Sequence, residues 1–262
     1  MVSARDYLRS DLEALFGLAG GMCSFDECRE RIIDSHEIPE RPIIHGQIGH
    51  IIAASDNGPR GDPHMTADER RRYNNLILVC PKHHKIIDTI DEKYPAPLLR
   101  SYKATHEVWV QRQTQEAMDQ FTDVELEVAC KAIEGSTVLG STSLRAVPPS
   151  EKMAHNALGS TSEQYLTIGM LRSDDVALYL ERHTTFLDEH FPGRLRASFV
   201  REYETYREKG LHGDALFLAL ASFAGGGTPS SVPFTRWAAG LAVLTHLFRI
   251  CDVFEEPPRA DA

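Results

Sequence analysis

The sequence predicts an α+β protein in which short strands, loops and helices come first and a mainly α-helical part follows. Three observations predict this division. The closely spaced Cys and His pairs that resemble metal ligands all lie before residue 134. Residues 135–162 are rich in Ser, Thr, Gly and Pro, and from residue 163 onward apolar residues recur every three or four positions. We therefore expect an N-terminal domain over residues 1–134, a linker over 135–162 and a helical domain over 163–262.

The composition is that of a globular chain. Its 262 residues are 42% hydrophobic and 25% charged, enough to bury a core without disulfides. Residues 1–18 carry acids within an apolar stretch and resemble an amphipathic helix more than a signal peptide. No run reaches the roughly 18 apolar residues that span a bilayer, so we expect a cytoplasmic protein without a membrane partner. The net charge of −10 argues against a passive nucleic-acid coat protein, but it leaves room for a small basic cleft.

Two short-spaced pairs predict a structural zinc site. Cys23 and Cys28 form a C-x4-C turn, and Cys80 and His83 form a C-x2-H turn. Zinc prefers four N or S ligands in a tetrahedron, and two tight turns supply two ligands each. Five cysteines in an intracellular chain also favour metal binding or burial over disulfides. The zinc would hold together the long polar insert between the two pairs.

The insert contains a second group of candidate residues. Residues 42–54 (PIIHGQIGHIIAA) predict a hairpin or strand pair, on which His45 and His50 would face opposite sides unless a glycine bends the chain. His50, among isoleucines, is the stronger candidate. A short buried strand, LILV at 76–79, leads into the second cysteine turn. The helix that follows places His84 and Asp88 four residues apart, on one face.

The segments IGHIIAA, YNNLILVC and CPKHHKIID together resemble the HNH endonuclease family, in its zinc-stapled branch. The resemblance covers roughly residues 20–110, including YPAPLLRSYKATHE, which is similar to a helix that often follows the motif. It implies a treble-clef-like ββα-metal nuclease domain with flanking helices. It also implies a hydrolase that cuts phosphodiester bonds in DNA, with duplex DNA as the expected partner.

The resemblance implies a role for each matching residue. His50 would be the general base that activates water, a task that suits imidazole. Asn75 would brace the loop and orient His50. His84 would bind a catalytic divalent ion, Mg²⁺ or Mn²⁺, and Asp88 would be a second ligand, directly or through water. His83 is assigned to zinc and His84 to the catalytic ion because adjacent side chains diverge.

The chain departs from the family at one position. Many members carry a metal ligand immediately before the catalytic histidine, where this chain has Gly49, with Gln47 or His45 as possible substitutes. Among basic residues we expect Arg60 to clamp a phosphate, because a guanidinium grips two oxygens at once. Lys82 and Lys85 are the other nucleic-acid-binding candidates. The run Arg70, Arg71 and Arg72 suits a solvated helix as well as DNA contact.

The C-terminal part shows no catalytic constellation. Its apolar periodicity predicts helices over VALYLERHTTFLDEHF, LRASFVREYETYREKG and FTRWAAGLAVLTHLFRICDVF, with Gly193 and Gly210 as helix ends and a turn over 224–233. We expect it to bind a partner protein or a small-molecule activator, or to form a homodimer. The nuclease motif is similar to HNH domains of prokaryotic antiphage effectors, which implies a regulated role in antiviral defence.

Two alternatives stay open. Because Gly49 replaces a metal ligand, the chain could instead be a zinc-stapled DNA- or protein-binding module with an inactive nuclease centre. RNA is a possible substrate, because the same chemistry works on either backbone. The remaining candidates are interpreted as structural: surface or core histidines and buried cysteines, namely His36, His64, His106, Cys130 and Cys251.

Overall fold

A computed structural model describes residues 3–34, 43–134, 149–186, 188–250 and 253–255. The chain forms two compact units. Unit 1 comprises residues 1–112 with 228–231, and unit 2 comprises 113–227 with 232–262. The division falls inside helix α4 (Ala96–Met118), not at the 134 boundary that the sequence predicts. Residues 135–148 of the expected linker lie outside the described residues, and residues 149–162 contain a helix and the start of another.

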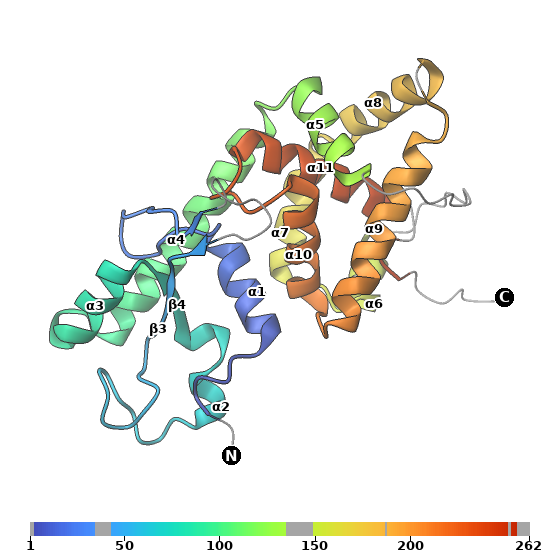
Figure 1. Cartoon of the computed structure of the whole chain (residues 1–262). Helices are drawn as coiled ribbons and strands as arrows, with labels where there is room; N and C mark the ends of the chain where they lie inside the picture. The colour runs from blue at the N-terminus through green and yellow to red at the C-terminus, as the bar shows by residue number, and fades with distance from the viewer. Residues whose placement is uncertain (1–2, 35–42, 135–148, 187, 251–252, 256–262) are drawn as a thin grey trace. The chain divides into compact units, whose positions relative to one another are not determined.

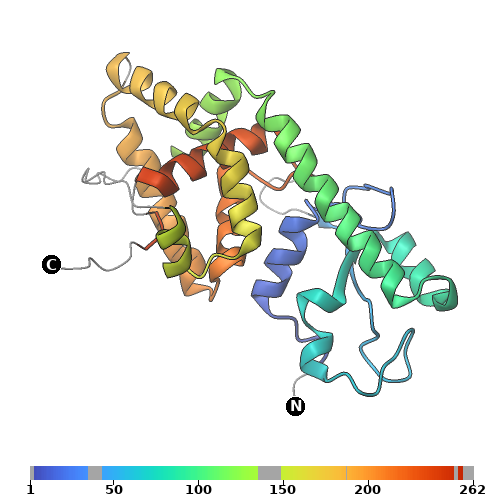
Figure 2. The ribbon, with the colours of Figure 1, turned by 180° about the vertical axis from the view of Figure 1, so that it is seen from behind.

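Unit 1 is an α+β unit of short elements (Figures 1 and 2). Besides the first part of α4, it contains α1 (Arg9–Leu18), β1 (Ile33–Asp34), β2 (Ile43–Ile44), β3 (Gln47–His50), α2 (Ala67–Arg70), a 3-10 turn (Tyr73–Asn75), β4 (Leu76–Val79), α3 (Pro81–Thr89) and a second 3-10 turn (Asp91–Lys93).

The strands form two small antiparallel sheets. β3 pairs with β4, and this register sets His50 opposite Leu76 and Gln47 opposite Val79. β1 pairs with β2. The expected pairing within residues 42–54 is therefore wrong, because β2 and β3 belong to different sheets. The backbone N–H groups of His45 and Gly46 both bond to the Ile32 carbonyl, which turns the chain between the two strands.

The core of unit 1 surrounds β4, which is buried along its whole length as the sequence predicts. α1 packs on β4, and α3 packs on β3. The first helix begins at Arg9, so the residues before it do not continue the amphipathic helix expected from residue 1. Instead, the described residues 3–8 form a turn and an extended stretch.

Unit 2 consists of helices, as the periodicity predicts. They are the end of α4, α5 (Asp123–Glu134), α6 (Pro149–His155), α7 (Ser160–Met170), α8 (Ser173–Phe186), α9 (Phe191–Glu208), α10 (Gly213–Gly225) and α11 (Phe234–Ile250). α10 and α11 form its centre and are buried over most of their length. The two helices can pack closely because residue 240 is a glycine. A Cβ atom there would lie 2.3 Å from the Ala224 carbonyl oxygen, which is too close.

Two details of unit 2 test the glycine assignments. Gly210 follows α9 with a φ of +82°, so it ends that helix as expected. Gly193 lies inside the first turn of α9, directly after a proline that starts the helix, so its assignment as a helix end is wrong. Across the residues that the structure describes, no helix has the length and apolar content needed to cross a membrane.

Candidate functional site

The two predicted cysteine turns meet in unit 1. The ligand atoms of Cys23, Cys28, Cys80 and His83 all lie within 4.8 Å of one another, close enough to bind one metal ion. Cys23 follows the two glycines after α1, and Cys80 and His83 lie at the junction of β4 and α3. A proline directly after Cys80 starts the helix, and this places His83 one turn from Cys80.

The distances are compatible with a tetrahedral zinc site. The Nδ1 atom of His83 lies 3.2 Å from the Cys80 sulfur and 3.6 Å from the Cys23 sulfur. Standard Zn–S and Zn–N bonds put sulfur and nitrogen ligands about 3.6 Å apart in a tetrahedron. Burial raises the pKa of the Cys23 and Cys80 thiols, and a cation bound by the quartet would stabilise their thiolate forms.

Neighbouring groups fix the ligands in place. The backbone N–H of Cys80 donates a hydrogen bond to the Cys23 sulfur at 3.2 Å, which joins the two turns directly. The Phe25 ring stacks on the His83 ring, with centroids 4.0 Å apart and planes within 8°. The stacking orients Nδ1 toward the sulfurs, so this residue set is compatible with zinc.

A separate cavity of about 730 Å³ in unit 1 is lined by three of the other predicted residues, His50, His84 and Asp88. His50 reaches it from the end of β3, and His84 and Asp88 reach it from α3. His84 Nδ1 lies 3.7 Å from Asp88 Oδ2, so the i, i+4 spacing does bring the two side chains together. His83 and His84 diverge as expected, one toward the cysteines and the other toward the cavity.

His50 has a defined tautomer. Its Nε2 lies 3.1 Å from the Ala4 carbonyl oxygen, and because a carbonyl only accepts, Nε2 carries the proton. Nδ1 then holds the lone pair of the neutral ring. Burial lowers the pKa of His50, and the charge of Arg5 lowers it further, while the Ala4 contact opposes both effects. The Tyr7 ring lies 5.7 Å from the imidazole ring, centroid to centroid.

Asn75 is buried and fixes the chain after β3. Its Oδ1 accepts a hydrogen bond from the Ile52 backbone N–H at 2.8 Å. Its amide nitrogen donates to the carbonyls of Ile52 and Arg70, both at 2.9 Å. Its own carbonyl accepts from Ile51 N–H. The side chain therefore holds the segment that directly follows His50, and it does not line the cavity.

Arg60 is an internal brace and not an exposed phosphate clamp. Its side chain is 6% exposed. Its guanidinium donates to the carbonyls of Ile51 at 2.8 Å, His50 at 3.3 Å and Ile87, and it pairs with Asp88 at 2.9 Å. Arg60 is therefore not the phosphate clamp that the sequence predicts, because its N–H donors already bind backbone carbonyls and the Asp88 carboxylate.

The residue before His50 faces the core. A Cβ atom at Gly49 would lie 3.2 Å from the Ile77 side chain and 3.4 Å from Ile87, so a side chain there would point away from the cavity. Of the two possible substitutes, Gln47 lines the cavity, whereas His45 is exposed and does not. Within the described residues, the Cys/His quartet is the one group of three or more Cys, His, Asp or Glu side chains whose ligand atoms lie close enough together to share a metal ion.

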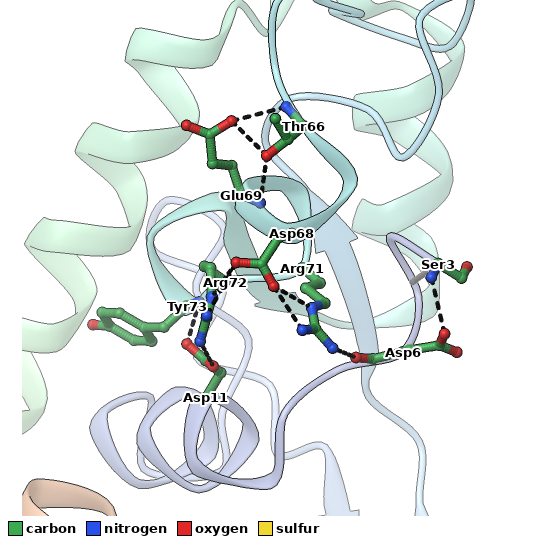
Figure 3. A network of polar contacts seen from close by, with 9 residues as sticks. All are labelled: Ser3, Asp6, Asp11, Thr66, Asp68, Glu69, Arg71, Arg72 and Tyr73. Carbon is green, nitrogen blue, oxygen red and sulfur yellow. Dashed lines mark hydrogen bonds and ion pairs between the residues drawn. The ribbon is translucent and has the colours of Figure 1, made fainter. Parts of the chain in front are cut away.

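The basic residues divide into exposed and committed groups. Lys82 and Lys85 are exposed on α3, beside a shallow apolar hollow and apart from the cavity. Arg70 is buried and donates to the Ala53 and Met65 carbonyls, both at 3.0 Å. Figure 3 shows Arg71 and Arg72 on either side of the Asp68 carboxylate, and Arg72 also pairs with Asp11 at 3.6 Å. The arginine run therefore stabilises unit 1 internally.

The residues interpreted as structural are mostly found as such. His106 is fully buried, with Nε2 donating to the Ala19 carbonyl at 2.9 Å, and His64 is exposed. Cys130 is buried. His36 and Cys251 lie outside the described residues.

Three residues near the N-terminus take part in the site although no motif identifies them. Ala4, Arg5 and Tyr7 either contact His50 or line its cavity. They are 43 or more positions from His50 in sequence, and no spacing signal links them to it. The available sequence signal for their role was that an arginine and a tyrosine come shortly before an amphipathic helix.

Comparison of the chain with models of known protein families finds no match, and comparison with curated protein sequences finds none. The likeness to HNH nucleases therefore depends on the residues described above.

Proposed function

We propose that this chain is a metal-dependent endonuclease of the HNH type that hydrolyses phosphodiester bonds in DNA. One observation supports this most strongly: His50 from β3 and the His84–Asp88 pair from α3 line the same cavity. The Cys/His quartet lies at the β4–α3 junction and holds the helix that carries that pair. A base and a pair of metal-ligand groups beside one cavity form a set suited to phosphodiester hydrolysis.

In this proposal His50 activates water. The Ala4 carbonyl keeps the proton on Nε2, so the Nδ1 lone pair accepts a proton from the attacking water. The water oxygen bonds to phosphorus, and the bond from phosphorus to the leaving sugar oxygen breaks. Because burial lowers the pKa of His50, the ring is in its neutral, basic form at pH 7.

His84 and Asp88 would hold the divalent ion. Bound there, Mg²⁺ or Mn²⁺ supplies positive charge that stabilises the phosphate and the leaving oxygen. Their candidate ligand atoms, His84 Nδ1 and Asp88 Oδ2, lie 3.7 Å apart. Arg60 holds the other Asp88 oxygen, which orients the carboxylate. Mg²⁺ usually keeps several waters, so two protein ligands are chemically sufficient.

Plasmid cleavage tests the proposal. We expect the wild type to cut DNA in Mg²⁺ or Mn²⁺, and His50→Ala to lose about 100-fold or more of the rate. The matched control is His45→Ala, because His45 is exposed, lies five residues away and does not line the cavity. The proposal fails if DNA remains intact with every divalent ion, or if His50→Ala cuts as fast as His45→Ala.

A second candidate function is a zinc-stapled binding module without catalysis. It is favoured by Gly49, which packs on Ile77 and Ile87 where many HNH nucleases carry a metal ligand. Calorimetric titration with Mn²⁺ separates the two functions. The nuclease requires one ion that is lost in His84→Ala, whereas the binding module requires zinc alone. Running the cleavage assay on RNA in parallel decides between the two nucleic-acid backbones.

We also propose a biological setting, a regulated effector of antiphage defence in which unit 2 binds the partner or activator. The similarity of the motif to HNH domains of such effectors supports this, as does the separate helical unit. Cleavage measured with and without candidate activators is the test, and activity that no partner or ligand changes would contradict it.

A further inference from the structure

The residues before α1 form a hook that is fixed at several points. The Ser3 backbone N–H bonds to the Asp6 carboxylate at 2.9 Å, and the Asp6 N–H bonds to the Ser3 carbonyl at 3.0 Å. The Ala4 side chain is buried. Arg71 donates to the Asp6 carbonyl at 2.9 Å and is itself held by Asp68. Figure 3 shows this connection from Asp68 through Arg71 to the hook.

The hook brings Arg5 to the cavity that contains His50, His84 and Asp88. The Arg5 charge adds to the lowering of the His50 pKa that burial causes, and it opposes the larger rise that burial causes in the pKa of Tyr7. Its backbone is secured on both sides, because Ala4 bonds to His50 and Asp6 bonds to Arg71.

Arg5 is an exposed residue, and no carboxylate among the described residues forms an ion pair with it. The other arginines of this region differ. Arg60 and Arg70 are committed to carbonyls and acids in the interior, and Arg71 is committed to Asp68 and the hook. Among the described residues, Arg5 is the only arginine or lysine that lines the cavity.

Building on the proposed nuclease function, we propose that Arg5 is a phosphate-binding residue, with its guanidinium on the nucleic-acid backbone at the cavity. A guanidinium presents paired N–H donors that match two phosphate oxygens. The position beside His50 places this contact next to the reacting phosphodiester. Arg5 thus takes the role that sequence reasoning assigned to Arg60.

The test measures DNA binding in the His84→Ala background, so that the DNA stays intact and the Ala4–His50 contact that secures the hook is kept. We expect Arg5→Ala to raise the Kd for duplex DNA about 10-fold and to reduce the slope of log K against log salt by about 1. Arg5→Lys keeps the charge and should recover the salt slope. In the otherwise wild-type enzyme, Arg5→Ala should raise KM about 10-fold and change kcat at most twofold, because the contact binds ground and transition states alike.

The matched control is Arg9→Ala. Arg9 lies four residues away, is exposed, pairs with Glu13 and does not line the cavity. If Arg5→Ala and Arg9→Ala have the same Kd and salt slope, the inference is wrong even when the wild type cuts DNA. If Arg5 governs binding but no ion supports cleavage, the inference stands and the proposed catalysis is wrong. If the chain does not bind nucleic acid at all, both are wrong.

Discussion

The two units are stabilised in different ways. Unit 1 has strands of two to four residues, and buried polar groups such as Arg70, Asn75 and His106 lie among its loops. Unit 2 has long helices, and α10 and α11 at its centre are mostly apolar and buried. Short elements bury little apolar surface, so hydrogen bonds hold the loops of unit 1, and a metal ion bound by the Cys/His quartet would hold them further.

The difference indicates why the chemistry-bearing residues gather in unit 1. His50 and Arg5 lie at the end of a strand and in a turn, where side chains from distant parts of the chain can converge. A loop-built site needs rigid supports, and the Cys/His quartet and the internal arginines supply them. If this is correct, perturbing the metal and perturbing the apolar helices should affect different units.

The largest predicted effect is metal removal. Structural zinc contributes roughly 10 kcal/mol or more to folding in small zinc domains, which exceeds the stability of most domains. We therefore expect Cys80→Ser, or strong chelation of the wild type, to unfold unit 1 and leave unit 2 folded. Peptide-resolved hydrogen exchange measures this: residues 76–112 should lose protection, and residues 213–250 should keep it.

The control is Cys130→Ala, which alters a buried cysteine outside the quartet. It should retain one zinc per chain by elemental analysis, and unit 1 should keep its protection. Equal loss of protection in both units after chelation would show that they do not differ as described.

The quartet and the His84–Asp88 pair could be predicted from sequence because each depends on short spacing. C-x4-C, C-x2-H and the i, i+4 relation are each fixed by local backbone geometry, and the need of one metal ion for four ligands predicts that the two distant turns meet.

The roles of Arg60, Gly49 and Arg5 could not be predicted in this way. Arg60 looks like an exposed loop arginine until Ile51, Ile87 and Asp88 surround it, and these contacts span up to 28 positions. Gly49 looks like a lost ligand until Ile77 and Ile87 occupy the space beside it. Arg5 reaches His50 through a fold-level contact 46 positions long, made by its neighbour Ala4. The helical character of unit 2 was predictable from its apolar period, whereas α5 and α6 lie in segments that the sequence assigned to the first domain and the linker.

A smaller effect is predicted for Asn75. Asn75→Ala removes three buried hydrogen bonds to backbone and leaves the Ile52 and Arg70 groups without that partner, which should cost unit 1 about 3 kcal/mol. Chemical denaturation followed by exchange in residues 76–112 measures it. Asn74→Ala is the matched control, because Asn74 is adjacent and exposed. Equal stability of the two variants would contradict the bracing role.

The smallest predicted effect concerns acid and unit 2. Burial, with the nearby Arg249 charge, lowers the pKa of His246 to about 4, while Ser173 and Asp174 act in the opposite direction. The folded state therefore resists protonation that the unfolded state accepts below about pH 6.5. Stability is fully present above that value and is lost as pH falls toward 4.

From pH 7 to pH 5 this linkage amounts to about 2 kcal/mol for one histidine. His246→Gln lacks the titrating ring, so its unit 2 should lose about 2 kcal/mol less than the wild type over the same interval, as measured by denaturation followed at residues 213–250. His212→Gln, an exposed change at the start of α10, should follow the wild-type curve. Parallel curves for the wild type and His246→Gln would mean that the buried imidazole does not limit unit 2 in acid. In that case the contrast between a polar unit 1 and an apolar unit 2 would be weaker than the burial of His246 indicates, because a helical core that holds this imidazole in either protonation state tolerates a buried charge.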